Sequence, residues 1–207
     1  MFKPTPIVCA LFLLAASGCG TLGNYNDRPA LTLSGVAVPD TPARAVQDLF
    51  MSRSTPYRIA VFEADPDTGQ PIEGEAGMSA LGVGGLFLPL VYDLNAIDIA
   101  EVETTEDGVA FVADLRSEVN LIPTWQGRVR GTVTADDQGI VRLKLRPYYA
   151  NWVIIGNVIA GGKLALDRID LAEDRFTGYY SVSFFGTGNA IGSGYFEATL
   201  GEIPETP

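Results

Sequence analysis

The chain has 207 residues, 47% of them hydrophobic, so it is long and apolar enough to build a folded core rather than a disordered coat. It carries 14 basic and 25 acidic residues, and this acidic balance excludes nucleic acid as a natural partner. It has two cysteines and no histidine, which excludes Ser-His-Asp triads, Cys-His pairs and zinc sites built from these residues. We therefore expect a protein without a catalytic site, a metal or another cofactor.

Residues 1–18 have the pattern of a secretory signal peptide. Lys3 gives a short positive region, and the apolar run 7–16 follows it. That run is too short to span a bilayer, which needs roughly 20 apolar residues. Small residues then lead directly to Cys19.

The small residues Ala16, Ser17 and Gly18 before Cys19 resemble the lipobox of bacterial lipoproteins. The resemblance implies cleavage before Cys19, which then carries a diacylglyceryl thioether and an acylated amine. Several acyl chains anchor a protein stably, so the expected partner at Cys19 is the membrane. Gly20 replaces the aspartate that favours inner-membrane retention in enteric-type bacteria, which implies a cell-envelope protein on the periplasmic face of the outer membrane. The alternative is an ordinary cleaved signal that leaves a free cysteine.

We expect the mature chain to consist of one domain that follows an N-terminal tether. Removing residues 1–18 leaves 13 of the 14 basic residues against all 25 acidic ones. Cys9 leaves with the signal and Cys19 carries lipid, so no disulfide is expected. Residues 19–41 are rich in glycine, asparagine and proline without a hydrophobic period, which predicts a lipidated tether. Residues 42–207 form the predicted domain.

A short helix is predicted over residues 42–52, at the start of the domain. Thr41 can cap its N-terminus. Val46, Leu49 and Phe50 fall on one face of such a helix, so we expect that face to pack on the core.

Beyond the helix, short runs of alternating apolar and polar residues are separated by polar or glycine-rich turns. The clearest runs, 128–135 and 141–146, flank the turn sequence Asp136–Gly139 and predict a β-hairpin. Six weaker runs bring the total to eight strands, which predicts a mainly β fold: an antiparallel β-sandwich or a small β-barrel. The weaker runs cover residues 57–64, 97–103, 109–122, 163–171, 179–185 and 195–200.

Two long stretches, residues 76–92 and 147–162, contain no charged residue. Both are shorter than a membrane-spanning helix. One interpretation makes them core segments whose glycines allow close backbone approach. The other is shallow insertion into lipid beside the acyl anchor. We favour the core, because lipid tolerates no irregular exposed backbone.

Two acidic clusters are interpreted as solvated turns. The first, residues 63–75, places Gly69 fifth from Asp65, whereas an EF-hand loop needs its glycine sixth. The second, residues 167–174, holds four carboxylates, but the sequence indicates no cleft that would pair two of them as acid and base.

The predicted hairpin concentrates basic residues on one face. Like charges on adjacent strands repel, so something should compensate them. One interpretation is internal pairing with carboxylates such as Glu101, Glu103 or Glu118. The other is an anionic partner, a lipid, a glycan or an acidic protein, held by arginine forks. The five cations are Arg128, Arg130, Arg142, Lys144 and Arg146. The residues predicted to face inward are Val129, Val133, Val141, Leu143 and Leu145.

Two functions fit these features. The preferred one is a non-catalytic, lipid-anchored envelope protein whose β-domain is a binding or assembly module. The alternative is a carrier whose apolar interior accepts a lipid or another hydrophobic ligand. A filled interior with an exposed patch favours the module, whereas a sizeable apolar cavity favours the carrier. Aromatic residues that could line such a cavity are Tyr148, Tyr149, Trp152, Tyr180, Phe184 and Phe196.

Overall fold

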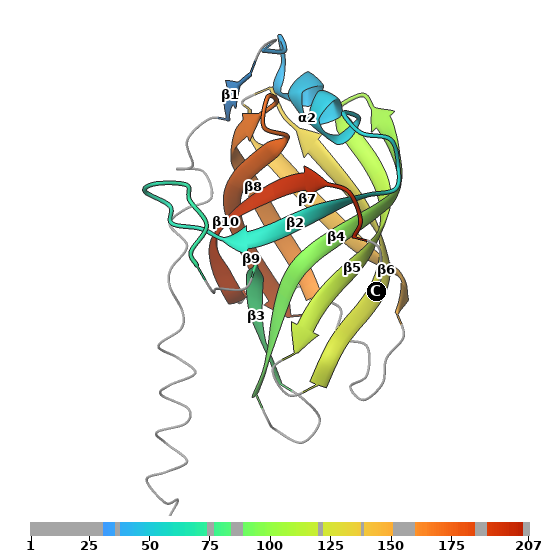
Figure 1. Cartoon of the computed structure of the whole chain (residues 1–207), viewed down its shortest axis with the longest axis vertical. Coiled ribbons are helices and arrows are strands. Elements are labelled where there is room, and N and C mark those ends of the chain that lie inside the picture. Colours follow the sequence, from blue (N-terminus) through green and yellow to red (C-terminus); the bar gives the residue numbers. More distant parts are fainter. Residues whose placement is uncertain are drawn as a thin grey trace, which may run out of the picture.

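In the computed structural model, ten strands form one sheet, with a short helix at one end of it (Figure 1). The elements are β1 (Thr32–Ser34), α2 (Pro42–Phe50), β2 (Tyr57–Glu63), β3 (Met78–Val83), β4 (Pro89–Thr105), β5 (Gly108–Val119), β6 (Ile122–Ala135), β7 (Val141–Ala150), β8 (Ala160–Asp170), β9 (Arg175–Phe184) and β10 (Ala190–Gly201). The structure describes residues 31–35, 38–73, 77–83, 89–119, 122–137, 139–150, 160–184 and 190–204.

Eight of the strands close into an antiparallel barrel. β4 to β10 follow one another round the wall, each antiparallel to the next. The last strand, β10, pairs with the first, β2, from Phe196 opposite Glu63 to Gly201 opposite Arg58. β2 also pairs with β4, which completes the ring. The predicted mainly β fold of about eight strands with one short helix is confirmed, in its barrel form.

The predicted hairpin is present as β6 and β7, which pair from Ala135 opposite Val141 to Gly127 opposite Ala150. Its turn is fixed by Asp136, whose Oδ1 accepts a hydrogen bond from the Ile140 amide at 2.9 Å. Gly139 adopts a φ of 79°, a conformation that glycine takes without steric cost.

The helix α2 covers one end of the barrel (Figure 1). Thr41 Oγ1 accepts a hydrogen bond from the Arg44 amide at 3.2 Å, so the predicted N-cap is confirmed. Val46, Leu49 and Phe50 are buried, and the Phe50 ring stacks on Phe111 with centroids 6.0 Å apart. The apolar face of α2 therefore closes this end of the core. No helix within the described residues is long and apolar enough to cross a membrane.

β3 is a strand that the sequence analysis did not predict. It lies inside the uncharged segment 76–92 and pairs with the first half of β4, from Met78 opposite Leu94 to Val83 opposite Pro89. β2 pairs with the second half of β4, so β2 and β3 divide one long neighbour between them. Residues 84–88 of this segment, and residues 151–159 of the uncharged segment 147–162, lie outside the described residues.

β1 lies within the segment predicted as tether, residues 19–41. It pairs in parallel with the end of β8, from Thr32 opposite Arg168 to Ser34 opposite Asp170. The Leu171 amide also donates to the Ser34 carbonyl at 3.0 Å. The chain from Leu31 onward therefore contacts the barrel.

The described part of the barrel interior is filled. Side chains from α2 and from the inward positions of β2 to β10 form one buried hydrophobic cluster. The void among them measures about 20 Å³ and is lined by apolar side chains alone. Such a space holds about one water molecule and no larger ligand.

Gly131 in β6 makes room for the core ring that faces it. A Cβ on residue 131 would lie 2.0 Å from Phe111 Cζ. We expect Gly131→Ala to destabilise the barrel by about 1–3 kcal/mol, the usual cost of overpacking a filled core. Urea unfolding measures the change. Gly201→Ala is the matched control, because nothing lies within 4 Å of the position that its new Cβ would take. Adding Phe111→Leu should recover part of the loss in Gly131→Ala, and no recovery would contradict the steric explanation.

A candidate binding surface on the barrel wall

Of the sequence-predicted site residues, Cys19, the predicted lipidation site, lies outside the described residues, whereas the basic hairpin falls within them. Arg128, Arg130, Arg142 and Lys144 are all exposed on the outer face of β6 and β7. The backbone of Arg146 lies in β7, opposite Arg130, and its side chain is outside the described set.

The inward face of the hairpin follows the prediction. Val129, Val133 and Val141 are buried, and Leu143 is partly buried against the core. Leu145 pairs with Gly131 in the backbone register. The predicted register, with valines inside and cations outside, is confirmed for these residues.

Two of the four described cations are paired with carboxylates on neighbouring residues. Arg128 donates to both carboxylate oxygens of Asp114, each at 2.9 Å, from directly across the β5–β6 ladder. Arg142 contacts Asp136 in the hairpin turn, with Nη1 and Oδ2 2.7 Å apart. Internal pairing thus takes place for Arg128 and Arg142, with Asp114 and Asp136 as the partners. The side chain of Glu118, one of the glutamates named as an example from the sequence, lies outside the described set.

A more buried ion pair lies in the same cross-strand row as Arg128. Asp98 of β4 is 7% exposed and accepts hydrogen bonds from Arg58 at 2.6 and 2.8 Å and from Arg116 at 2.8 Å. Burial alone would raise the pKa of this carboxyl, but the hydrogen bonds from the two arginines outweigh burial and lower it. The cluster holds β2, β4 and β5 together on the outer side of the wall.

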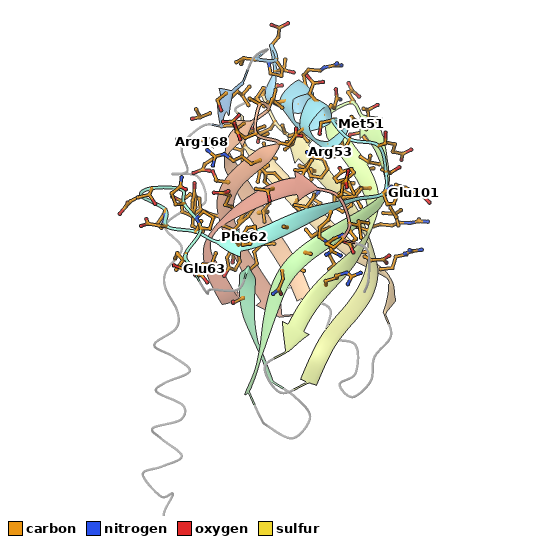
Figure 2. All side chains as sticks on the ribbon, viewed as in Figure 1. Met51, Arg53, Phe62, Glu63, Glu101 and Arg168 are labelled. Atoms are coloured by element: carbon orange, nitrogen blue, oxygen red, sulfur yellow. The ribbon has the colours of Figure 1, made fainter. Side chains whose placement is uncertain are left out.

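A hollow of about 760 Å³ opens on the outer face where β4, β5, β6 and β7 run side by side. Glu101 and Glu103 of β4 line one side of it, and Arg130 and Lys144 line the other. Figure 2 shows Glu101 on the outside of the barrel, away from the side that carries Phe62 and Arg168. The floor includes Ala110, Val112 and Thr132, whose side chains are short.

The two glutamates and Lys144 have no ion pair within the described part of the chain, although all three are exposed. Arg130 takes part in another polar or ring interaction. The backbone register explains the separation of acid from base. Val112 stands between Glu101 and Arg130, while Ala110 and Thr132 stand between Glu103 and Lys144. Opposite charges therefore face each other across the hollow without meeting.

A second polar cluster lies on the outer side of β8, β9 and β10. Asp167 accepts hydrogen bonds from Thr177 Oγ1 at 2.6 Å and from the Tyr195 hydroxyl at 3.0 Å. Burial, and then the nearby Asp167 charge, raise the pKa of Tyr195 to about 12. Glu197 is 5% exposed and lies 3.8 Å from Arg175, and burial raises the pKa of its carboxyl. These contacts tie neighbouring strands together.

Three of the remaining acidic residues singled out in the sequence, Asp65, Asp170 and Asp174, lie at or beside turns, whereas Glu63 lies in β2 and Glu75 is outside the described residues. Asp170 Oδ1 accepts the backbone amide of Ala172 at 3.0 Å, and Asp174 pairs with Arg53 at 2.9 Å. Asp65 Oδ1 accepts the amide two residues further on at 2.7 Å. Among the residues that the structure describes, no group of three or more Asp or Glu could hold a metal ion.

Sequence reasoning found the basic side of the surface but missed the hollow and the Asp98 cluster. The strand runs 97–103 and 109–122 contained the signal for the acidic side, because their acidic residues lie at outward positions.

Comparison of the chain with protein-family models, with curated proteins and with solved structures finds no match.

Asp98→Asn tests the buried ion pair. We expect a loss of about 2–3 kcal/mol at pH 7, less than the 3–5 kcal/mol typical of a fully buried broken pair, because Arg58 and Arg116 are partly exposed. The folded-state pKa of Asp98 is lowered, so its contribution is present above the usual aspartate pKa of about 3.9 and is lost as pH falls below it. Urea unfolding at pH 7 and pH 3 should therefore show the two proteins converging in acid. Asp114→Asn, at an exposed pair, should cost under about 1 kcal/mol at either pH.

Proposed function

We propose that the chain is a lipid-anchored cell-envelope protein that binds a partner through the outer wall of its barrel and catalyses no reaction. The lipobox-like residues before Cys19 support the anchor, which places the protein in the envelope, on the periplasmic side of the outer membrane. The barrel is then a rigid support that presents a side-wall surface to other envelope components.

The filled interior of the described part of the barrel is the observation that distinguishes a binding module from a carrier. A carrier needs an enclosed cavity of roughly 300–1,000 Å³ for a drug-sized or lipid-sized ligand. The void in the described part of the core is about 20 Å³, whereas the outer hollow is about 760 Å³. Within the part of the chain that the structure describes, the larger space is therefore on the wall, which supports a binding module.

The basic side of the hollow supports an anionic group on the partner, from a lipid, a glycan or an acidic protein. Arg128 and Arg142 are already neutralised by Asp114 and Asp136, so they contribute little net attraction. Lys144 and Arg130 both line the hollow, and Arg130 already takes part in another interaction. We assign the partner's anionic group to Lys144, with Arg130 beside it on the same side of the hollow.

The anchor is tested by Cys19→Ala. This variant should accumulate as an unlipidated precursor and leave the detergent phase in a Triton X-114 partition, because it lacks the acyl chains that hold it in the membrane. Cys9→Ala is the matched control, since Cys9 leaves with the signal and its loss should change nothing. Unchanged partitioning of Cys19→Ala would contradict the lipoprotein assignment.

The surface is tested by reversing Arg130 and Lys144 to glutamate in the full chain carrying Cys19→Ala. Binding to vesicles containing phosphatidylglycerol, to a sulfated polysaccharide and to poly-glutamate is measured at low and high salt. We expect one of these probes to bind in a salt-sensitive manner, and the reversal to abolish binding with little change in Tm. Reversal of the exposed Asp114 and Arg128 pair, as a swap, should leave binding unchanged. A large fall in Tm without any probe binding to the parent protein would overturn the proposed function.

A further inference from the structure

We propose that the outer hollow binds an extended polypeptide segment in which basic and acidic residues alternate. This inference rests on the proposed function and names the partner that the same surface takes. A polypeptide of this pattern would place its cations against Glu101 and Glu103 and its carboxylates against Arg130 and Lys144.

The spacing of charges along each side of the hollow matches an extended chain. Glu101 and Glu103 are two residues apart on β4, which separates them by about 6.6–6.8 Å along the strand. Arg130 pairs with Arg146 and Lys144 with Thr132, so Arg130 and Lys144 are diagonal neighbours, roughly 7–8 Å apart. Side chains on one side of an extended peptide repeat at the same interval of about 6.6–6.8 Å. Two successive peptide side chains can therefore meet two charges on either side.

The width of the hollow suits one chain. β4 and β6 are separated by one strand, so their backbones lie about 9.5 Å apart, which is two strand spacings. The floor between them is made by Ala110 and Val112, which leave the space open. An extended segment lying along β5 would turn alternate side chains towards the acidic and the basic side.

Three of the charges around the hollow, those of Glu101, Glu103 and Lys144, are available to such a partner. Elsewhere on the same strands, Arg128 meets Asp114 and Arg142 meets Asp136 at 2.7–2.9 Å. Glu101, Glu103 and Lys144 have no such contact among the described residues. Arg130 need not be free to contribute, since its place on the basic side is enough.

A purely anionic partner fits the hollow less well. It would have to lie against Glu101 and Glu103, which repel it, on a chain whose formal net charge is −11. A partner with both signs satisfies both sides at once. Because exposed ion pairs are individually weak, we expect modest affinity and strong salt dependence.

The test uses the full chain carrying Cys19→Ala and two labelled octapeptides of equal composition, one alternating lysine and glutamate, the other with four lysines followed by four glutamates. Fluorescence anisotropy at low salt should show the alternating peptide binding about tenfold more tightly than the block peptide. The Glu101→Lys, Glu103→Lys variant should lose about tenfold, and so should Arg130→Glu, Lys144→Glu. The quadruple variant should recover binding, because an alternating peptide shifted by one residue presents the opposite charges.

A swap of Asp114 and Arg128, outside the hollow, is the matched control and should leave the affinity unchanged. Ala110→Trp should block the hollow without altering its charge. Equal binding of the two octapeptides, or tighter binding after Glu101→Lys, Glu103→Lys, would overturn the alternating-charge partner. If poly-glutamate then binds in a manner that depends on Lys144, the proposed function stands without this inference. If no probe binds the parent chain, both fail.

Discussion

The pairing of β2 with β10 is the contact on which the barrel depends, because it joins the first and last strands of the ring. It brings together residues more than 130 positions apart, such as Glu63 and Phe196. Non-local pairings of this kind form late and slowly compared with hairpins. Once it forms, every strand of the wall acquires an inside and an outside. The period-2 pattern of each strand then sorts apolar side chains into the core and charges onto the wall.

In the described part of the barrel the core is filled with apolar side chains, and the charged side chains lie on the outer surface. There, Asp114 and Arg128 meet because the register puts them directly opposite each other. Glu101 and Arg130 stay apart because β5, with short side chains, lies between them. One register thus produces both a stabilised wall and a hollow with two unlike sides.

Patterns within short segments of sequence were enough to predict the β6–β7 hairpin and α2, because short-range contacts determine both. Alternation predicted the hairpin around Asp136, and the hydroxyl of Thr41 before an amphipathic run predicted α2. β3 was missed, because its residues are apolar on both sides and show no alternation. β1 was missed because its three residues are held by β8, 136 positions further along the chain at Thr32 and Arg168.

The candidate surface was likewise predictable only where its cause is local to one strand. Alternation alone places Arg128 and Lys144 outward, so the basic side could be read from the sequence. The carboxylates that lie near these cations could not be predicted, because their positions depend on the register between strands. The register of β4 against β5 shifts twice, between Leu94 and Ala96 and between Ile99 and Glu101. A one-residue error there would exchange inside for outside, so neither the Asp98 cluster nor the hollow follows from patterns in single strands.

The parallel contact of β1 with β8 fixes where the chain leaves the barrel, at the same end as α2 (Figure 1). With Cys19 as the proposed anchor, the twelve steps of chain from there to Leu31 reach at most roughly 40 Å when fully extended. Under that proposed anchoring, this length sets how far the α2 end of the barrel can stand from the bilayer. It limits the partners of the barrel to those that come within that distance of the membrane surface.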